Sequence, residues 1–588
     1  MSNGDNGPVG HRDAGALFGN SGNPVFEWTL SATTFDDMVR LVVQDKILPV
    51  IFVPGIMGSN LMSNDRSRDK VWRLDTTAGQ PLGLARRMSF SGPATRQRRM
   101  HPARTAVDPR GSIPGRAVGS VSSRTQYRDE RFWGEVSEGS YHSFLLWLEE
   151  RLNGQGVNPA NWQDFYYTAV SAIPEPGQRR PELALPPGIP MRMRAFDPVW
   201  YVESNGPGHA VAESIASDDL IKRAKFRMPV YACGYNWLDS NSAAAERLGN
   251  RIEAVIAANN RNGFKCDQVI LVTHSMGGLV ARRCAAMAGM KDRIAGVVHG
   301  VMPAVGAAVA YRRCKVGMRD ESFVAGLVIG SNGREVTAVF AQAPGALQLL
   351  PTGEYQAGWL KIEGVDGREV ESLPASDPYG EIYLRRDRWW GLVRPEWLRP
   401  QGGRPVSWNE YALNISAAKE FHEQIRGHYH DATYVYYGAD RNIASFERVR
   451  WQMKQGMSPD RSPRPSEQQV RDLRFDEVRD SGSNPLYVGG QTEYLHNHAG
   501  AMWGGAAASA YETSYWEISV AGQDGGGDGT VPTSSGRAPL LAAGAAGCIR
   551  QQFRMGGFEH EPSYKNQQAQ FATLFSIQKI AAVARLAT

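Results

Sequence analysis

The sequence DQVILVTHSMGGLVARRCAAMAG at residues 267–289 carries the strongest structural signal in the chain. Four consecutive apolar residues, Val269 to Val272, are typical of a strand that is buried on both faces. From Met276 onward, small and apolar residues alternate as they do in a helix that packs against a sheet. The stretch therefore predicts a strand, a sharp turn at Ser275, and a helix.

This turn has the form of a nucleophile elbow, in which a strand ends in x-Ser-x-Gly-Gly and a helix follows directly. The elbow lifts the serine hydroxyl clear of the sheet and points the N–H of the next residue at a developing oxyanion. Ser275 is thus the candidate nucleophile and Met276 a candidate oxyanion donor. Thr273 stands where the motif has glycine, and its bulk predicts a slightly opened or differently packed elbow.

The flanking sequence predicts a sheet around this strand. Apolar runs at 50–53, 228–232 and 294–303 are typical of further buried strands, and an amphipathic helix is expected from about Ser242. Strands that alternate with helices at this spacing imply a parallel sheet with helices on both faces. The predicted class is an α/β-hydrolase fold with a mostly parallel, doubly wound sheet, in which a further strand at 433–440 resumes the core.

The chain divides into four regions by composition. Pro-Gly turns and a Trp-rich segment at 385–400 interrupt the alternation, and they predict an inserted cap, or lid. The charged, Pro-interrupted segment 451–485 is interpreted as a surface excursion. The regions are a tail and first helix (roughly Thr34–Gln44) in 1–45, a hydrolase core in 46–304 and 431–588, an Arg-rich insertion at 62–132, and the cap at 305–430.

Two of these segments have two interpretations each. The Arg-rich insertion, with Arg96, Arg98 and Arg99 close together, is either a long solvated loop or a basic patch for anionic lipid headgroups or a partner. The tryptophans of the cap either pack in an ordinary core, or they shelter an acyl chain or enter a membrane surface.

A serine nucleophile needs a base and an acid, and in this fold the acid precedes the histidine after the nucleophile. Asp528 lies in the Gly-rich loop GGGDGTVPTSSG at 525–536, and His560 lies in the loop FEHEPSY before the last helix. Asp528 is thus the candidate acid and His560 the candidate base. The competing candidates are Asp440 and Asp524 for the acid, and His496 and His498 for the base.

The second oxyanion donor is expected in the loop after the first core strand, PGIMG at 54–58. Glycines on both sides allow close approach of the backbone, so the amide of Ile56 or Met57 is the candidate. His496 and His498 also suggest a metal site, but no third ligand stands at matching spacing. We therefore expect no metal and no cofactor.

Composition limits the class of protein. Hydrophobic residues make up 42% of the 588 residues, which excludes a mostly disordered chain, and the net charge of +5 does not point to nucleic acid. The five cysteines show no C-x-x-C spacing, so they favour a reducing cytosol over a disulfide framework. The first residues lack the features of a signal peptide, and no apolar run of ~18 residues predicts a membrane span.

Five motifs in order, VPGIMGSNL, GYNWL, THSMGG, GDGTVP and FEHEPSY, resemble those of the lecithin:cholesterol acyltransferase-like hydrolases, which include lysosomal phospholipase A2 and bacterial lipases. Asn236 replaces the family's Asp in the second motif. The resemblance covers 48–60, 228–304 and 430–588, and it implies Ser275, Asp528 and His560 as the triad and phospholipids or related esters as substrates. The family's disulfide-closed lid is not evident, because no cysteine lies between Asn60 and Cys233.

The chain also resembles, more weakly, the large leaderless lipase effectors of bacterial type VI secretion. This resemblance implies synthesis in the bacterial cytoplasm, export to a target cell by a non-Sec route, peripheral action at a membrane, and an immunity or secretion-apparatus partner. The hypothesis is a serine carboxylic-ester hydrolase, a phospholipase A or lipase. The alternatives are an acyltransferase with a lipid acyl donor and a non-catalytic hydrolase-fold binding protein.

Overall fold

The computed structural model describes most of the chain. Continuous stretches cover 45–73, 92–113, 124–153, 225–319, 329–456, 464–489 and 514–587, apart from 543 and 546. Residues 219, 222 and 223 are also described, as are short strands at 11–15, 17–18, 24–25, 38–42, 492–496 and 508–512.

A six-stranded sheet forms the centre of the molecule, with the strand order β11-β6-β12-β13-β16-β25. Every neighbouring pair is parallel, so the carboxyl ends of all six strands meet at one edge. The chain order reverses between β6 and β12, and a parallel sheet binds ligands at such a switch point. The strands are β6 (Val50–Val53), β11 (Val230–Ala232), β12 (Val269–His274), β13 (Ile294–Gly300), β16 (Thr433–Gly438) and β25 (Ile549–Met555).

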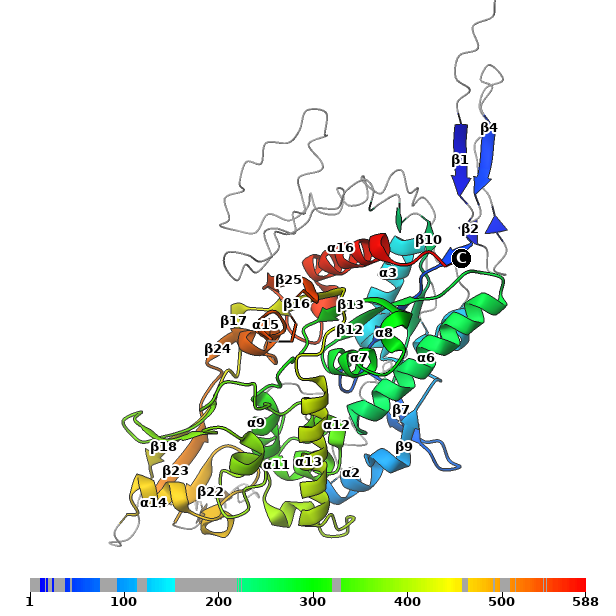
Figure 1. Ribbon diagram of the computed structural model, residues 1–588. Helices are drawn as coiled ribbons and strands as arrows, with labels where there is room; N and C mark the ends of the chain where they lie inside the picture. The colour runs from blue at the N-terminus through cyan, green and yellow to red at the C-terminus, as the bar shows by residue number, and fades with distance from the viewer. Residues whose placement is uncertain are drawn as a thin grey trace, which may run out of the picture.

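Helices cover both faces of this sheet (Figure 1). Alternate residues such as Ile51 and Leu271 belong to the core under α6 and α7, whereas Phe52 and Val272 belong to the core under α3 and α16. Burial on both faces explains why these strands are continuously apolar. The expected doubly wound α/β-hydrolase fold is therefore confirmed. The helices are α3 (Ser143–Asn153), α6 (Asn241–Arg261), α7 (Gly277–Ala285) and α16 (Gln567–Val583).

The last strand of the sheet was not expected from the sequence. β25 reads IRQQFRM and pairs only with β16, so it forms one edge of the sheet. Its two arginines are exposed. An edge strand tolerates this polarity, and it therefore lacks the continuous apolar run that identifies the inner strands.

A second six-stranded sheet has the order β15-β14-β18-β23-β20-β19. Two of its strands precede β16 in the chain and four follow it, so the second sheet is not confined to residues 305–430. The strands are β14 (Leu360–Glu363), β15 (Glu369–Leu373), β18 (Val449–Gln455), β19 (Val478–Arg479), β20 (Leu486–Val488) and β23 (Trp516–Val520).

The interpretation of 451–485 as a surface excursion is wrong for β18 and β19. Val449, Trp451 and Met453 of β18 are buried and alternate with more exposed polar residues, which is the period of a strand with one face in a core. Helices α9 (Val309–Val316), α11 (Gly333–Phe340) and α13 (Trp408–Ile425) lie below the central sheet in Figure 1, on the same side of it as the second sheet. We call the second sheet and these helices the second module.

The tryptophans of segment 385–400 pack inside the second module. Trp389, Trp390 and Trp397 are all buried, and the ring of Trp389 meets that of Trp451 edge-on at 5.3 Å. The indole N–H of Trp389 donates to the Val470 carbonyl at 2.9 Å. These three side chains therefore belong to a core and do not form a surface that enters a membrane.

Part of the Arg-rich insertion is anchored rather than solvated. Within α2 (Pro93–Arg99), Arg96 is 1% exposed and pairs with Glu335 of α11 at 3.5 Å. The Gln342 side chain donates to the carbonyls of Gln97 and Met100. Arg98 is exposed and Arg99 is partly exposed, but each donates to a backbone carbonyl, of Gly402 and Lys70 respectively. Arg96 is thus unavailable to a lipid headgroup.

The first helix expected at Thr34–Gln44 is wrong. This segment contains β4 (Met38–Val42), which pairs in parallel with β1 (His11–Gly15). β-branched residues such as Val39 and Val42 favour extended backbone, and a pairing partner overrides a short helical pattern.

All five cysteines are free thiols. Within the described part of the chain, no helix is both long and apolar enough to cross a bilayer. The same residues contain no cluster of three or more His, Cys, Asp or Glu side chains that could hold a metal ion.

Candidate active site

Ser275 lies at the tip of a strained turn between β12 and α7. Its φ of +53° is in the left-handed region, which costs a non-glycine residue of order 1–3 kcal/mol, and its N–H donates to the Gly300 carbonyl at 2.9 Å. The turn is tight enough to require glycine at 277, where a Cβ would lie 2.4 Å from the Val53 carbonyl oxygen. Backbone strain held by surrounding structure is a feature of functional sites.

The side chains of Ser275, His560 and Asp528 form one hydrogen-bonded chain. Ser275 Oγ lies 2.8 Å from His560 Nε2, and His560 Nδ1 lies 2.9 Å from Asp528 Oδ2. A carboxylate only accepts hydrogen bonds, so Nδ1 carries the imidazole proton and Nε2 is free to accept from the serine hydroxyl. The arrangement can therefore remove the proton of Ser275.

Asp528 is fixed beside the imidazole of His560 by hydrogen bonds from its own loop. It is 1% exposed, and its Oδ1 accepts from the N–H groups of Thr530 at 3.1 Å and Val531 at 2.7 Å. The backbone N–H of His560 donates to the Asp528 carbonyl at 2.8 Å. The Gly-rich loop thus binds its own carboxylate and the histidine loop together.

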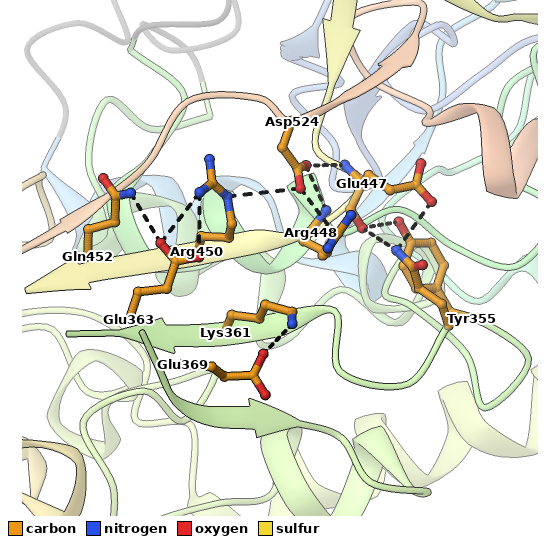
Figure 2. A network of polar contacts seen from close by, with 10 residues as sticks. Tyr355, Lys361, Glu363, Glu369, Glu447, Arg448, Arg450, Gln452 and Asp524 are labelled. Atoms are coloured by element: carbon orange, nitrogen blue, oxygen red, sulfur yellow. Dashed lines mark hydrogen bonds and ion pairs between the residues drawn. The ribbon is translucent and has the colours of Figure 1, made fainter. Parts of the chain in front are cut away.

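The competing aspartates have other partners. Asp440 accepts from the N–H groups of Asn442 at 2.8 Å and Gly557 at 2.9 Å, so it braces the start of the histidine loop. Asp524 accepts from the N–H groups of Glu447 and Arg448, each at 3.0 Å (Figure 2).

The competing histidines are not described at the side-chain level. His496 is the last residue of β21 (Thr492–His496), and only its backbone is described. His498 lies outside the described residues.

The backbone segments that carry the candidate oxyanion donors lie close to Ser275. Residues 55–58 form a turn closed by the Gly58 N–H and the Gly55 carbonyl at 3.0 Å, with Ile56 and Met57 at its tip. This turn lies against the nucleophile, since a Cβ on Gly55 would be 2.9 Å from Ser275 Cβ. Met276 is the N-cap of α7, and the N-terminus of a helix presents N–H groups without intrahelical partners.

Thr273, which stands where the motif has glycine, is buried among residues of neighbouring elements. The residue is fully buried, and its hydroxyl lies 3.0 Å from Nδ1 of His299 on β13. Its carbonyl accepts from the Tyr564 hydroxyl at 2.8 Å. The threonine is therefore accommodated by partners on neighbouring elements.

Sequence reasoning missed two residues behind Ser275: His274, which contacts His560 of the triad, and Tyr141, which contacts His274. His274 Nε2 lies 2.9 Å from the His560 carbonyl, and His274 Nδ1 lies 3.0 Å from the Tyr141 hydroxyl. Burial and the nearby His560 lower the pKa of His274 to about 3, so its ring is neutral. The position of His274 directly before Ser275 is a signal that could have found it, whereas Tyr141 lies 133 residues from His274 and has none.

The chain matches no known family profile and no curated protein. It is similar to a chain in the crystal structure of the Tle4–Tli4 complex, with 28% identity and a TM-score of 0.67 over 92% of this chain and 99% of that one. It also matches the phospholipase PlaB from Legionella pneumophila, with 12% identity over 42% of this chain and 72% of that one. The TM-score of this second match is 0.14, which is too low to bear on fold or function.

Proposed function

We propose that this protein is a serine carboxylic-ester hydrolase that acts on lipids, as a phospholipase A or a lipase. The observation that carries the proposal is the hydrogen-bonded chain from Ser275 through His560 to the buried Asp528. This chain stands at the carboxyl edge of a parallel sheet, beside the point where its strand order reverses. Nucleophile, base and orienting acid in one line are the requirements of acyl transfer through a serine.

The reaction follows from these positions. Ser275 Oγ attacks the ester carbonyl carbon while its proton passes to His560 Nε2, and the N–H groups of Met276 and of Ile56 or Met57 stabilise the oxyanion. His560 then donates that proton to the leaving alcohol oxygen as the C–O bond breaks, which leaves an acyl-enzyme. Water, deprotonated by His560, releases the fatty acid and restores the serine.

The lipid assignment and the biological setting rest on likeness. The sequence resemblances and the structural match to a chain of the Tle4–Tli4 complex support a phospholipid or related lipid ester as substrate. We propose that the protein meets this substrate at a membrane surface. We propose that the protein is a secreted antibacterial effector, made in a bacterial cytoplasm and exported to a target cell by a non-Sec route. The matched chain was solved in a complex, which supports an immunity or secretion-apparatus protein as partner.

The test is hydrolysis of phosphatidylethanolamine–phosphatidylglycerol vesicles by the wild-type protein and by Ser275→Ala. We expect the wild type to release both fatty acid and lysophospholipid, and Ser275→Ala to lower the rate by about 10⁴-fold or more. The matched control is Ser416→Ala, because Ser416 is exposed on α13 and its hydroxyl bonds only its own helix. This control is expected to keep the wild-type rate.

Each other outcome has a defined meaning. Cleavage of short soluble esters but not of phospholipid would keep the serine mechanism and overturn the lipid substrate. Transfer of the acyl chain to an added alcohol in preference to water would make the protein an acyltransferase. If the wild type neither cleaves any ester nor reacts with a fluorophosphonate, the remaining hypothesis is a non-catalytic binding protein of this fold.

A further inference from the structure

A buried chain of hydrogen bonds links the two sides of the candidate active site behind Ser275. The N–H of Gly55, in the turn beside the nucleophile, donates to the Tyr141 hydroxyl at 3.2 Å. The Tyr141 hydroxyl lies 3.0 Å from His274 Nδ1, and His274 Nε2 lies 2.9 Å from the His560 carbonyl. The candidate oxyanion turn and the histidine loop are thus connected through two side chains.

The direction of every bond in this chain is determined by chemistry. The His560 carbonyl only accepts, so Nε2 of His274 carries the proton and Nδ1 accepts from the Tyr141 hydroxyl. That hydroxyl in turn accepts from Gly55. Both side chains are almost fully buried, with Tyr141 at 2% and His274 at 3% exposure. Water therefore does not compete for these bonds, and each is costly to lose.

The chain of hydrogen bonds ends on the backbone of His560, the residue that carries the candidate base. The N–H of His560 donates to the Asp528 carbonyl at 2.8 Å, and the His560 carbonyl accepts from His274 at 2.9 Å and from the Ser563 N–H at 3.5 Å. Tyr141, near the other end of these bonds, packs on the central sheet, because the centroid of its ring lies 4.9 Å from that of Phe52 on β6. Tyr141 and His274 therefore connect the central sheet to the backbone of His560.

We propose that Tyr141 and His274 are positioning residues that hold His560 and the oxyanion turn in register on either side of Ser275. Neither side chain touches the reacting atoms in this arrangement. Their effect is on the fraction of molecules in which base, nucleophile and oxyanion donors are aligned at once. This inference rests on the proposed hydrolase function.

The second module contains a matched chain with no part in the site. The Tyr379 hydroxyl lies 2.6 Å from His422 Nδ1, and His422 Nε2 lies 2.8 Å from the Gln348 carbonyl. Both side chains are buried. Tyr379→Phe therefore removes the same kind of bond at a similar structural cost, and it serves as the control for Tyr141→Phe.

The experiment measures kcat and KM on a short soluble ester, the rate of fluorophosphonate labelling, and the melting temperature. We expect Tyr141→Phe to lower kcat and the labelling rate together by roughly 10- to 100-fold with KM nearly unchanged, because misplacement by about 1 Å can cost 10²-fold. Tyr379→Phe should shift the melting temperature by a similar amount and leave kcat unchanged.

Substitution of His274 tests the contact with the His560 carbonyl. His274→Gln places an amide N–H where Nε2 stands, and His274→Leu has no donor. We expect the glutamine variant to retain most of the wild-type kcat and the leucine variant to lose as much as Tyr141→Phe. If His274→Leu does not fold, Tyr141→Phe against Tyr379→Phe still decides the question.

Three results would overturn the proposal. The first is wild-type kcat in folded Tyr141→Phe, and the second is equal loss in Tyr141→Phe and Tyr379→Phe. The third is equal loss in the glutamine and leucine variants of His274. A wild type that neither cleaves the ester nor takes the label overturns the proposed function instead, and this inference falls with it.

Discussion

Three aspartates near the candidate site, Asp440, Asp524 and Asp528, carry the same carboxylate but have different partners. Asp528 bonds the imidazole and two N–H groups of its own loop, whereas Asp440 bonds the backbone at the start of the histidine loop. An acid in a triad acts by selecting the tautomer of the histidine. The role of each aspartate therefore depends on which donors its carboxylate oxygens bind.

The first prediction compares Asp528→Asn with Asp440→Asn. The side-chain amide introduced by Asp528→Asn would favour the wrong imidazole tautomer, so kcat should fall by about 10⁴-fold, whereas Asp440→Asn should lower kcat by less than about tenfold. The measurement is the initial rate on a soluble chromogenic ester. A larger loss in Asp440→Asn than in Asp528→Asn would reassign the acid.

At the scale of elements, the segment directly before Asp528 is hydrogen-bonded to the residues that lead into β18 of the second module. β24 (Gly525–Gly527) pairs with β17 (Asp440–Ser445), and Asp524, directly before β24, accepts from the N–H groups of Glu447 and Arg448, directly before β18. Asp524 also pairs with Arg448 at 3.3 Å and Arg450 at 4.0 Å (Figure 2). The second sheet therefore helps to hold the loop of the candidate acid in place.

The second prediction separates charge from hydrogen bonding at Asp524. The arginines are partly exposed, so the ion pairs contribute ~0–1 kcal/mol, whereas two N–H groups without an acceptor cost ~1–3 kcal/mol each. We expect Asp524→Asn, which keeps an acceptor oxygen, to be mild and Asp524→Ala to increase hydrogen exchange across residues 525–531. Equal exchange in the two variants would contradict this account.

At the scale of the whole molecule, the protein buries histidines as neutral rings in both modules. Burial lowers the pKa of His274 and His299 to about 3 and that of His422 to about 4. In the unfolded chain a histidine has a pKa of about 6.5, so below that pH the unfolded state binds more protons. The stabilisation is complete above pH ~6.5 and is lost as the pH falls toward these low pKa values.

The third prediction is a fall in the free energy of unfolding between pH 7 and pH 5. Each of these histidines contributes up to ~1.4 kcal/mol for each pH unit below ~6.5. Glu149, whose pKa is raised by burial, opposes the trend. Urea denaturation at several pH values measures the slope, and His422→Gln should reduce it. A stability that is flat over this range would show that the buried rings are not neutral.

The sequence by itself determined the central strands, the elbow and the candidates for the triad. Val50 to Val53 and Val269 to Val272 are buried on both faces, so local composition suffices to identify them. Ser275 is marked by a local turn, and Asp528 and His560 follow from chain order and loop chemistry. Each of these signals lies within a few consecutive residues.

The tertiary structure alone decided which aspartate meets the histidine, which strands form the second sheet, and that Tyr141 and His274 lie behind the nucleophile. The second sheet joins β14 to β18, which are separated in the chain by the core strand β16. Tyr141 reaches His274 across 133 residues and Gly55 across 86. Such contacts depend on the packing of whole elements, and short-range periodicity carries no information about them.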